Sequence, residues 1–534
     1  MRAERLFRVL GLVDPVLVEE AGRTPPARRG DWKRWAALAA CLALAVGLGF
    51  GWRVTGGFGG YGSGMSGGDS GSSGGAVFDG AQGPADPGAD GSGGAEDGIS
   101  FLSCAGPVLP LTTVEDPAGL TAEREISWDF APGAYPDGEP RQWGAEVTDT
   151  CVLRNDTEDE ITVTALYPFA GSFSELAETL PAVTVDGEPV AAELCPGPYS
   201  GGFESTVGAA ERDTMNLLDL RDWRGYKALL ESGEYQAQAL GPYPAMDIPV
   251  TVYEFSDFKG PHEPYRAATQ AVSFDIDPER TAVFTFGFNG MEADGTFRRY
   301  SCFVPDGRRK EPEVKLLAVL GEDIGDFVLQ GYQDGGCNPG EEIEGVSCTV
   351  TRRESTLEEV LDLACRGCLE GYDEYAEGWV TEDGPVTFEM YRGAAAELLS
   401  RYGLLSGAPM DRYADGPLDD MVMETLWQKR VLYLRFPVTV PAGGSVGVEC
   451  VFWKEPSFDF GGSGSENVGI QGYDLVTRLG SGLAFTRQSA ALVNTENVEI
   501  TGQNFGFDPA GGVSSVELDL DREHYYLEIR PVEA

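Results

Sequence analysis

Hydrophobic and polar residues alternate along much of the chain beyond residue 100, as in β-strands with one buried and one solvated face. The alternation is strong in Ala145–Arg154 and Glu160–Tyr167, which flank a polar turn at Asn155–Asp159. It returns in Val431–Val440 and Ser445–Trp453. We expect each of these two pairs of segments to form a β-hairpin.

Other segments extend the strand pattern, and a few show helical spacing. Trp223–Ser232 and Phe388–Tyr402 each end at a glycine, and Ser355–Glu358 is a capping box that opens a helix through Cys368. The fold class that follows is mainly β with helical insertions (α+β). The further strands are predicted at Val183–Val190, Pro249–Phe255, Ala271–Asp275, Thr281–Phe288, Arg298–Val304, Val314–Leu320 and Tyr525–Arg530.

One uncharged segment, Trp35–Trp52, has the length and composition of a transmembrane helix. Four basic residues lie just before it, between Arg28 and Arg34, whereas after Arg53 the next basic residue is Arg124. The positive-inside rule therefore places the N-terminus in the cytoplasm and the rest outside. A cleaved signal peptide is the competing interpretation, but the preceding region is long for one and no cleavage site follows cleanly. We expect an uncleaved, single-pass anchor in the cell membrane.

Charge separates the two sides of this segment. The 534-residue chain has a net charge of -47, yet residues 1–53 contain nine of its 39 basic and only five of its 86 acidic residues. An acidic exterior repels phosphate backbones, which argues against a nucleic-acid partner. Residues 53–100 are rich in glycine and cannot bury enough apolar surface to fold, so they predict a disordered tether.

The chain is long enough for several folded units. We expect β-sandwich-like extracytoplasmic domains after the transmembrane helix. The predicted organisation is a cytoplasmic tail (1–34), a transmembrane helix (35–52), a tether (53–100), a β-sandwich-like domain (101–260), a second β-rich region (261–352), a helical section (353–425) and a C-terminal β-rich region (426–534).

Two stretches carry resemblances. The tail Arg5–Ala21 and the segment Lys33–Cys41 resemble the N-termini of single-span membrane proteins of Gram-positive anaerobic bacteria, a group without known function. Some of that group resemble anti-sigma factors, which implies a cytoplasmic protein partner for the tail. The Asn155 turn and the Tyr167–Phe169 corner resemble bacterial extracytoplasmic β-sandwich modules, which implies a fold and no activity.

Nine cysteines follow the predicted membrane segment, and an odd number cannot pair completely. Cys365 and Cys368 form the one Cys-x-x-Cys, but the motif closes a helix, whereas a redox pair opens one. Their helical spacing with neighbouring apolar residues indicates that both thiols face the core. We find no further ligands at zinc spacing. The nine are Cys104, Cys151, Cys195, Cys302, Cys337, Cys348, Cys365, Cys368 and Cys450.

No other motif predicts a catalytic, cofactor or metal site. The serine-protease-like strings Gly64–Gly68 and Gly68–Gly71 fall in the tether, where no strand and helix hold the serine. His262 and His524 are expected at the surface or at a strand edge.

Acidic pairs are too common in this chain to be informative. Asp275 with Asp277 and Asp519 with Asp521 could suggest calcium, but solvated surface is the better interpretation. Asn155–Thr157 fits both an N-glycosylation site and a β-turn, and we favour the turn.

The sequence thus favours a non-enzymatic envelope protein that binds, senses or scaffolds an unknown extracellular protein or envelope ligand. An anti-sigma-type transmembrane signalling protein is the first alternative, and an extracytoplasmic hydrolase that uses acidic residues is the second.

Overall fold

The computed structural model describes residues 106–135, 138, 141, 144–200, 223–261, 267–305, 314–371, 376–406, 415–459 and 469–532. These residues form several sheets and few helices, so the prediction of a mainly β fold is confirmed. The predicted cytoplasmic tail, transmembrane helix and tether lie outside the described residues. Among the helices that are described, none is long and apolar enough to cross a membrane.

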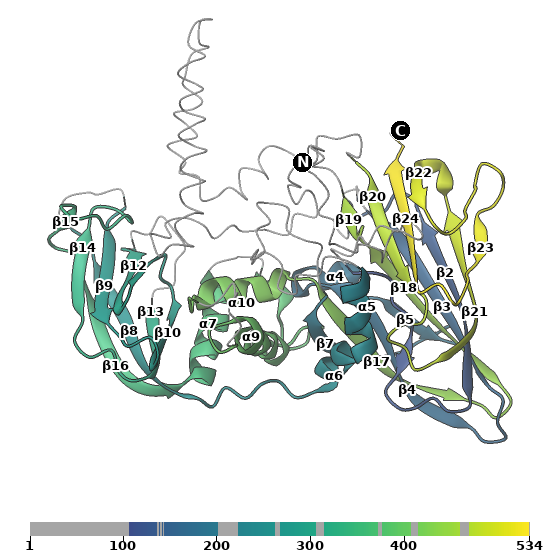
Figure 1. The fold of residues 1–534 in the computed structure, drawn as a ribbon, viewed down its shortest axis with the longest axis horizontal. Helices are drawn as coiled ribbons and strands as arrows, with labels where there is room; N and C mark the ends of the chain where they lie inside the picture. Colours follow the sequence, from purple (N-terminus) through teal and green to yellow (C-terminus); the bar gives the residue numbers. More distant parts are fainter. Residues whose placement is uncertain are drawn as a thin grey trace, which may run out of the picture. The chain divides into compact units, whose positions relative to one another are not determined.

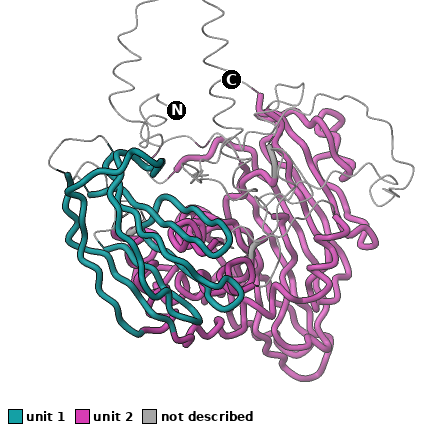
Figure 2. The backbone as a smooth tube through the Cα atoms, turned by 60° about the vertical axis from the view of Figure 1, so that its left-hand side comes forward, with its two compact units in different colours: residues 1–68, 250–354 teal, residues 69–249, 355–534 magenta. Residues whose placement is uncertain are grey.

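The chain divides into two compact units, coloured separately in Figure 2. Within the described residues, unit 1 is residues 250–354, and unit 2 comprises the residues before and after them. Unit 1 is therefore an insertion in unit 2. The two segments of unit 2 that flank the insertion are joined by hydrogen bonds. The amides of Leu357 and Glu358 donate to the carbonyls of Ile248 and Met246, each at 2.8 Å.

Unit 1 is a β-sandwich of two sheets, with strand orders β10-β13-β8-β16 and β11-β12-β9-β14-β15. Phe255 and Leu317 of the first sheet pack with Phe274 and Tyr300 of the second in one core. All five strands predicted between Pro249 and Leu320 form. The bounds are β8 (Pro249–Lys259), β9 (Thr269–Asp275), β10 (Thr281–Phe286), β11 (Gly290–Asp294), β12 (Phe297–Phe303), β13 (Lys315–Gly321), β14 (Val328–Tyr332), β15 (Glu342–Ile343) and β16 (Ser347–Thr356).

Unit 2 contains a seven-stranded sheet, β23-β21-β2-β3-β18-β5-β6, and two four-stranded sheets, β1-β4-β17-β7 and β19-β20-β24-β22 (Figure 1). The seven-stranded sheet and the sheet β1-β4-β17-β7 combine strands from before and after unit 1, so the predicted segments 101–260 and 426–534 share them, whereas all strands of β19-β20-β24-β22 come after unit 1. Before unit 1 lie β1 (Thr112–Thr113), β2 (Leu120–Asp129), β3 (Ala145–Asn155), β4 (Ile161–Gly171), β5 (Ala182–Val185), β6 (Glu188–Pro189) and β7 (Glu193–Tyr199). After it lie β17 (Arg430–Val440), β18 (Ser445–Lys454), β19 (Phe458–Asp459), β20 (Gln471–Val476), β21 (Ala484–Val493), β22 (Val498–Gln503), β23 (Ser515–Glu517) and β24 (His524–Pro531).

The two predicted hairpins are wrong in their pairing, although all four strands form. β3 pairs with β2 and β18, whereas β4 pairs with β1 and β17, so each connection crosses from one sheet to the other. The β3–β4 and β17–β18 connections lie next to each other, because β3 pairs with β18 in one sheet and β4 pairs with β17 in the other. Alternation identifies the buried face of each strand but does not identify its neighbour. Here the buried faces meet across the sandwich, as the ring contact of Tyr167 with Phe452 at 6.0 Å illustrates.

Five of the helices that the structure describes lie in two groups. α5 and α6 cover the sheet β1-β4-β17-β7, where Tyr226 and Tyr235 pack with Leu166 and Val431. α7, α9 and α10 pack on one another. The helical elements are η2 (Phe173–Glu175), α4 (Leu176–Thr179), α5 (Trp223–Ser232), α6 (Glu234–Leu240), α7 (Leu357–Gly371), α8 (Ala376–Trp379), α9 (Phe388–Tyr402), α10 (Leu418–Trp427) and η3 (Thr495–Asn497).

The helix was predicted to be capped by Ser355, but the capping residue is the next one, Thr356. β16 continues to Thr356, and the Thr356 hydroxyl accepts from the amide of Glu359 at 3.3 Å. The hydroxyl of Ser355 instead donates to the carboxylate of Glu359. The helix therefore begins at Leu357, because the strand holds Ser355 extended.

Candidate functional site

The predicted Cys-x-x-Cys faces the core, as its helical spacing indicated. Cys365 and Cys368 lie on α7 and are both 0% exposed. Burial raises the pKa of the Cys365 thiol well above its ordinary value, so this sulfur is not a thiolate at neutral pH. The Cys368 sulfur lies 3.9 Å from that of Met423. Within the described residues no cluster of His, Cys, Asp or Glu side chains is arranged to hold a metal ion.

His524 is buried, so the expectation of a surface or edge residue is wrong. Its Nε2 lies 2.7 Å from Oδ1 of Asp474, and the two side chains are 1% and 0% exposed. Its ring stacks on Trp223 of α5 with centroids 4.6 Å apart. β24 pairs with both β20 and β22, so His524 begins an interior strand of its sheet. His262, Cys104 and the serine-protease-like strings lie outside the described residues.

A serine lies next to this His–Asp pair, but its hydrogen bonds go to the backbone. The Ser457 hydroxyl donates to the carbonyl of Gly106 at 3.3 Å and accepts from the amide of Asp474 at 3.3 Å. Ser457 is 0% exposed. A nucleophilic serine needs a hydrogen bond to its base and access for a substrate. We therefore read Ser457, Asp474 and His524 as a structural group that ties β20, β24 and α5 together.

A second buried polar group lies between the seven-stranded sheet and β4. Arg124 Nη2 and Asp149 Oδ2 are 2.6 Å apart, and the Tyr167 hydroxyl donates to the same carboxylate at 3.1 Å. Arg124 also donates to the carbonyls of Val476 at 2.9 Å and of Leu109 at 3.0 Å. Burial alone would lower the pKa of Arg124, but the carboxylate beside it reverses the effect. The guanidinium is charged, and each of its three nitrogens donates a hydrogen bond.

Two thiols flank this ion pair. Burial, helped by the charge of Asp149, raises the pKa of Cys151 to about 12, and burial raises that of Cys450 as well. Cys151 lies opposite Val448, and Cys450 lies opposite Asp149, so the two cysteines are diagonal neighbours. Diagonal Cβ atoms are ~7 Å apart, which is too far for a disulfide without movement of the strands. The thiols behave as small core residues.

The two acidic pairs that were considered as calcium ligands each contain a carboxylate that stabilises a turn. Asp277 accepts from the amide of Glu279 at 3.0 Å, and Asp519 accepts from the amide of Asp521 at 2.9 Å. Asn155 is also a turn residue: its amide donates to the carbonyls of Asp159 at 2.8 Å and Val440 at 3.1 Å. At 1% exposure this nitrogen is closed to a glycan.

Surface carboxylates form a regular row on the outer face of the seven-stranded sheet. The row occupies alternate strands, which places neighbouring carboxylates about 9–10 Å apart. Retaining glycosidases need about 5 Å between their carboxyl groups. In both retaining and inverting glycosidases, the carboxyl group that acts as the acid must be shielded from water. The carboxylates of the row are Glu517, Glu125 and Glu449, and Ser489, Thr150 and Thr184 occupy the strands next to them.

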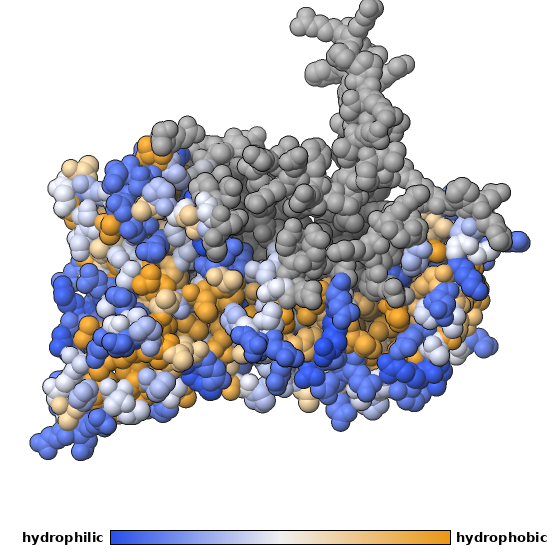
Figure 3. Space-filling model, turned by 180° about the vertical axis from the view of Figure 1, so that it is seen from behind, coloured by the Kyte–Doolittle hydropathy of each residue, from blue (hydrophilic) through white to orange (hydrophobic). Residues whose placement is uncertain are grey.

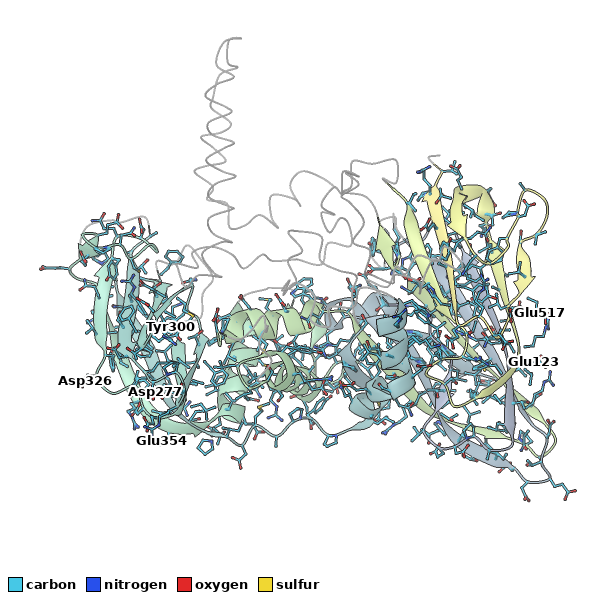
Figure 4. The ribbon with its side chains drawn as sticks, viewed as in Figure 1. Glu123, Asp277, Tyr300, Asp326, Glu354 and Glu517 are labelled. Carbon is cyan, nitrogen blue, oxygen red and sulfur yellow. The ribbon has the colours of Figure 1, made fainter. Side chains whose placement is uncertain are left out.

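Glu123 and Glu517, labelled in Figure 4, show how such residues are used. Glu123 accepts from Arg154 at 3.0 Å, and Glu517 lies 4.0 Å from Arg487. These are partly exposed ion pairs, which stabilise a protein little. On the face seen in Figure 3, hydrophobic residues gather in patches, with hydrophilic residues between and around them.

Comparison of the chain with protein-family models, with curated proteins and with solved structures finds no match.

Proposed function

We propose that the protein is a single-pass membrane protein whose extracytoplasmic part binds, senses or scaffolds a component of the cell envelope without catalysing a reaction. The observation that best supports this proposal is that the buried polar groups of unit 2 form hydrogen bonds inside the protein. Asp474, His524, Arg124 and Asp149 are each at most 3% exposed and are engaged in internal hydrogen bonds. They contribute to the architecture of unit 2 and offer nothing to a substrate.

The insertion of unit 1 also supports a binding role. Its two ends meet at Ile248 and Leu357, so a contiguous β-sandwich extends from a single place in unit 2. Insertions at such closed junctions add a module without breaking the host fold. Unit 1 is thus suited to carry a recognition surface.

Topology is the first test of this proposal. Intact cells that express the chain with a C-terminal tag should lose the tag to external protease, and the chain should stay in the membrane after carbonate extraction. A tag that is protected in intact cells, or a chain released by carbonate, would refute the membrane placement.

Catalysis is tested separately. The purified full-length chain should not turn over ester, glycoside or peptide substrates above a heat-treated control. Turnover that disappears on replacement of any one acidic residue would overturn the non-enzymatic assignment in favour of a hydrolase.

The predicted tail motivates one alternative, an anti-sigma-type signalling protein. Arg5–Ala21 has the pattern of two short amphipathic helices, which would bind a cytoplasmic protein. Residues 1–34 used as bait should then recover one specific partner from a cytoplasmic extract. A bait with the apolar residues of 5–21 replaced by serine is the matched control.

A further inference from the structure

The segment that leads into unit 2, residues 106–113, runs through its interior. All eight residues of this lead-in segment are buried. Val108 and Leu111 are each 2% exposed, and Leu109 belongs to the core beneath α5 and α6. First residues of a folded unit are often loosely held unless something ties them down. Here the chain is buried from the first residue described.

The lead-in segment joins the two four-stranded sheets of unit 2. Val108 pairs in parallel with Leu475 of β20, through hydrogen bonds of its amide to the Asp474 carbonyl at 2.9 Å and of the Val476 amide to its carbonyl at 3.0 Å. Four residues later, Thr112 and Thr113 form β1 and pair with β4. One short stretch of backbone thus connects β20 of one sheet to β4 of the other.

Polar side chains from other parts of unit 2 hold the same stretch. Ser457 donates to the Gly106 carbonyl at 3.3 Å, Arg124 to the Leu109 carbonyl at 3.0 Å, and Ser481 to the Leu111 carbonyl at 2.6 Å. These donors lie far apart in sequence. Three of the eight carbonyls of the segment, those of Gly106, Leu109 and Leu111, are bonded in this way.

Withdrawal of the lead-in segment would therefore affect more than its own contacts. Arg124 would lose one of its acceptors while remaining paired with Asp149 in the core. The amide of Val476 and the carbonyl of Asp474 would be left without their strand partner in a buried place. The two four-stranded sheets would lose the segment that pairs with both of them.

We propose that the lead-in segment is a latch that couples the chain before residue 106 to the integrity of unit 2. Tension on the chain before residue 106 acts first on this segment, and its release opens the sandwich where Arg124 and β20 lose their hydrogen bonds to the segment. The idea rests on the proposed membrane anchoring, because only an anchored tether transmits tension. An ordinary N-terminal strand would instead detach and leave the remaining sheets intact.

Hydrogen exchange of the purified full-length chain tests the coupling. We expect Val108→Ala to raise exchange at least tenfold in β20, β2, β3 and β4 as well as in residues 106–113. Unit 1 is the internal control and should not change. The matched control is Val183→Ala, a buried valine of β5, whose effect should stay near β5 and β18. An increase confined to residues 106–113 would overturn the proposal.

Single-molecule stretching of the unaltered full-length chain provides a measurement that needs no variant. With handles at the two termini, force enters unit 2 through residue 106 and leaves through β24. We expect the first rupture to open unit 2 as a whole. A separate early step that releases only residues 106–119, about 50 Å of chain at ~3.6 Å per residue, would overturn the latch. Both measurements use purified protein, so a failed topology experiment would refute the anchor and leave these results interpretable.

Discussion

At the scale of single residues, the most consequential pair is Arg124 with Asp149. Both are buried charges, and a buried charge that loses its partner is far more costly than the pair itself is stabilising. Tyr167, Leu109 and Val476 complete the hydrogen bonding, which is why the core tolerates the guanidinium. The pair and its hydrogen bonds therefore link β2, β3 and β4 with the lead-in segment in the core.

This leads to a stability prediction. Arg124→Met should lower the free energy of unfolding of unit 2 by about 3–5 kcal/mol, since Asp149 is left charged and buried. The double variant Arg124→Met/Asp149→Leu should recover most of the loss. Urea unfolding followed by tryptophan fluorescence is the measurement, because unit 1 contains no tryptophan and the signal excludes it. A double variant as unstable as the single one would contradict the ion-pair explanation.

Glu397 of α9 gives a prediction about pH. Burial raises its pKa, although Arg430 and Arg401 oppose the shift. The folded state then binds the proton more tightly than the unfolded state, so the charged carboxylate costs stability above the folded pKa, and the cost vanishes as pH falls through it. Glu397→Gln should be more stable than wild type at pH 7, with the difference shrinking towards pH 4. Glu382→Gln, an exposed acid, is the control, and a difference that does not change with pH would contradict the assignment.

At the scale of elements, the stacked crossings between sheets are tied by one side chain. Asn155 ends β3, and its side-chain amide donates to the carbonyl of Val440 at the end of β17. Its backbone amide donates to the carbonyl of Gly444 at 2.9 Å. The loop after β3 and the loop after β17 are thereby joined. Asn155, a turn residue of the β3–β4 connection, thus holds the β17–β18 connection in place.

Asn155→Ala should accordingly destabilise unit 2 by about 2 kcal/mol, since buried carbonyls lose their donor. The loss should appear as faster hydrogen exchange at the ends of β3, β4, β17 and β18. Asp156→Ala, an exposed neighbour in the same loop, should change little. Equal effects of the two substitutions would show that loop composition matters and the Asn155 contacts do not.

Element existence was predictable, whereas element pairing was not. The alternation in β3, β4, β17 and β18 and the end of α9 at Gly403 are local properties of the sequence, and the structure has all of them. Whether β3 pairs with β4 or with β18 depends on residues hundreds of positions away. A single sequence carries no local signal for that choice.

The buried polar groups were missed for the same reason. His524 follows Glu523 at the start of a strand and looks like a boundary residue, and Asp474 gives no sign that it will face it. Their contact depends on the pairing of β20 with β24. Cys365 and Cys368 were placed correctly because helical spacing alone decides which side of α7 they occupy.

At the scale of the whole molecule, the insertion of unit 1 predicts two separable folding units. Residues 249–356 expressed alone should fold, with dispersed amide NMR signals, since both sheets and their shared core lie within that range. The full chain with 250–354 replaced by a short Gly-Ser linker should keep the tryptophan-monitored unfolding transition of unit 2 within a few degrees. A linker variant that fails to fold would show that unit 1 supports its host.

The order of strands in the seven-stranded sheet has a consequence for the making of the protein. β2 and β3 leave the ribosome early, yet their partners β21 and β18 are among the last segments to appear. Unit 1 can complete its sandwich during synthesis, whereas the first strands of unit 2 must wait with unpaired edges, since long-range pairing cannot begin until the partner exists. The host should therefore fold after its insert, and chains truncated before residue 430 should aggregate through those waiting strands.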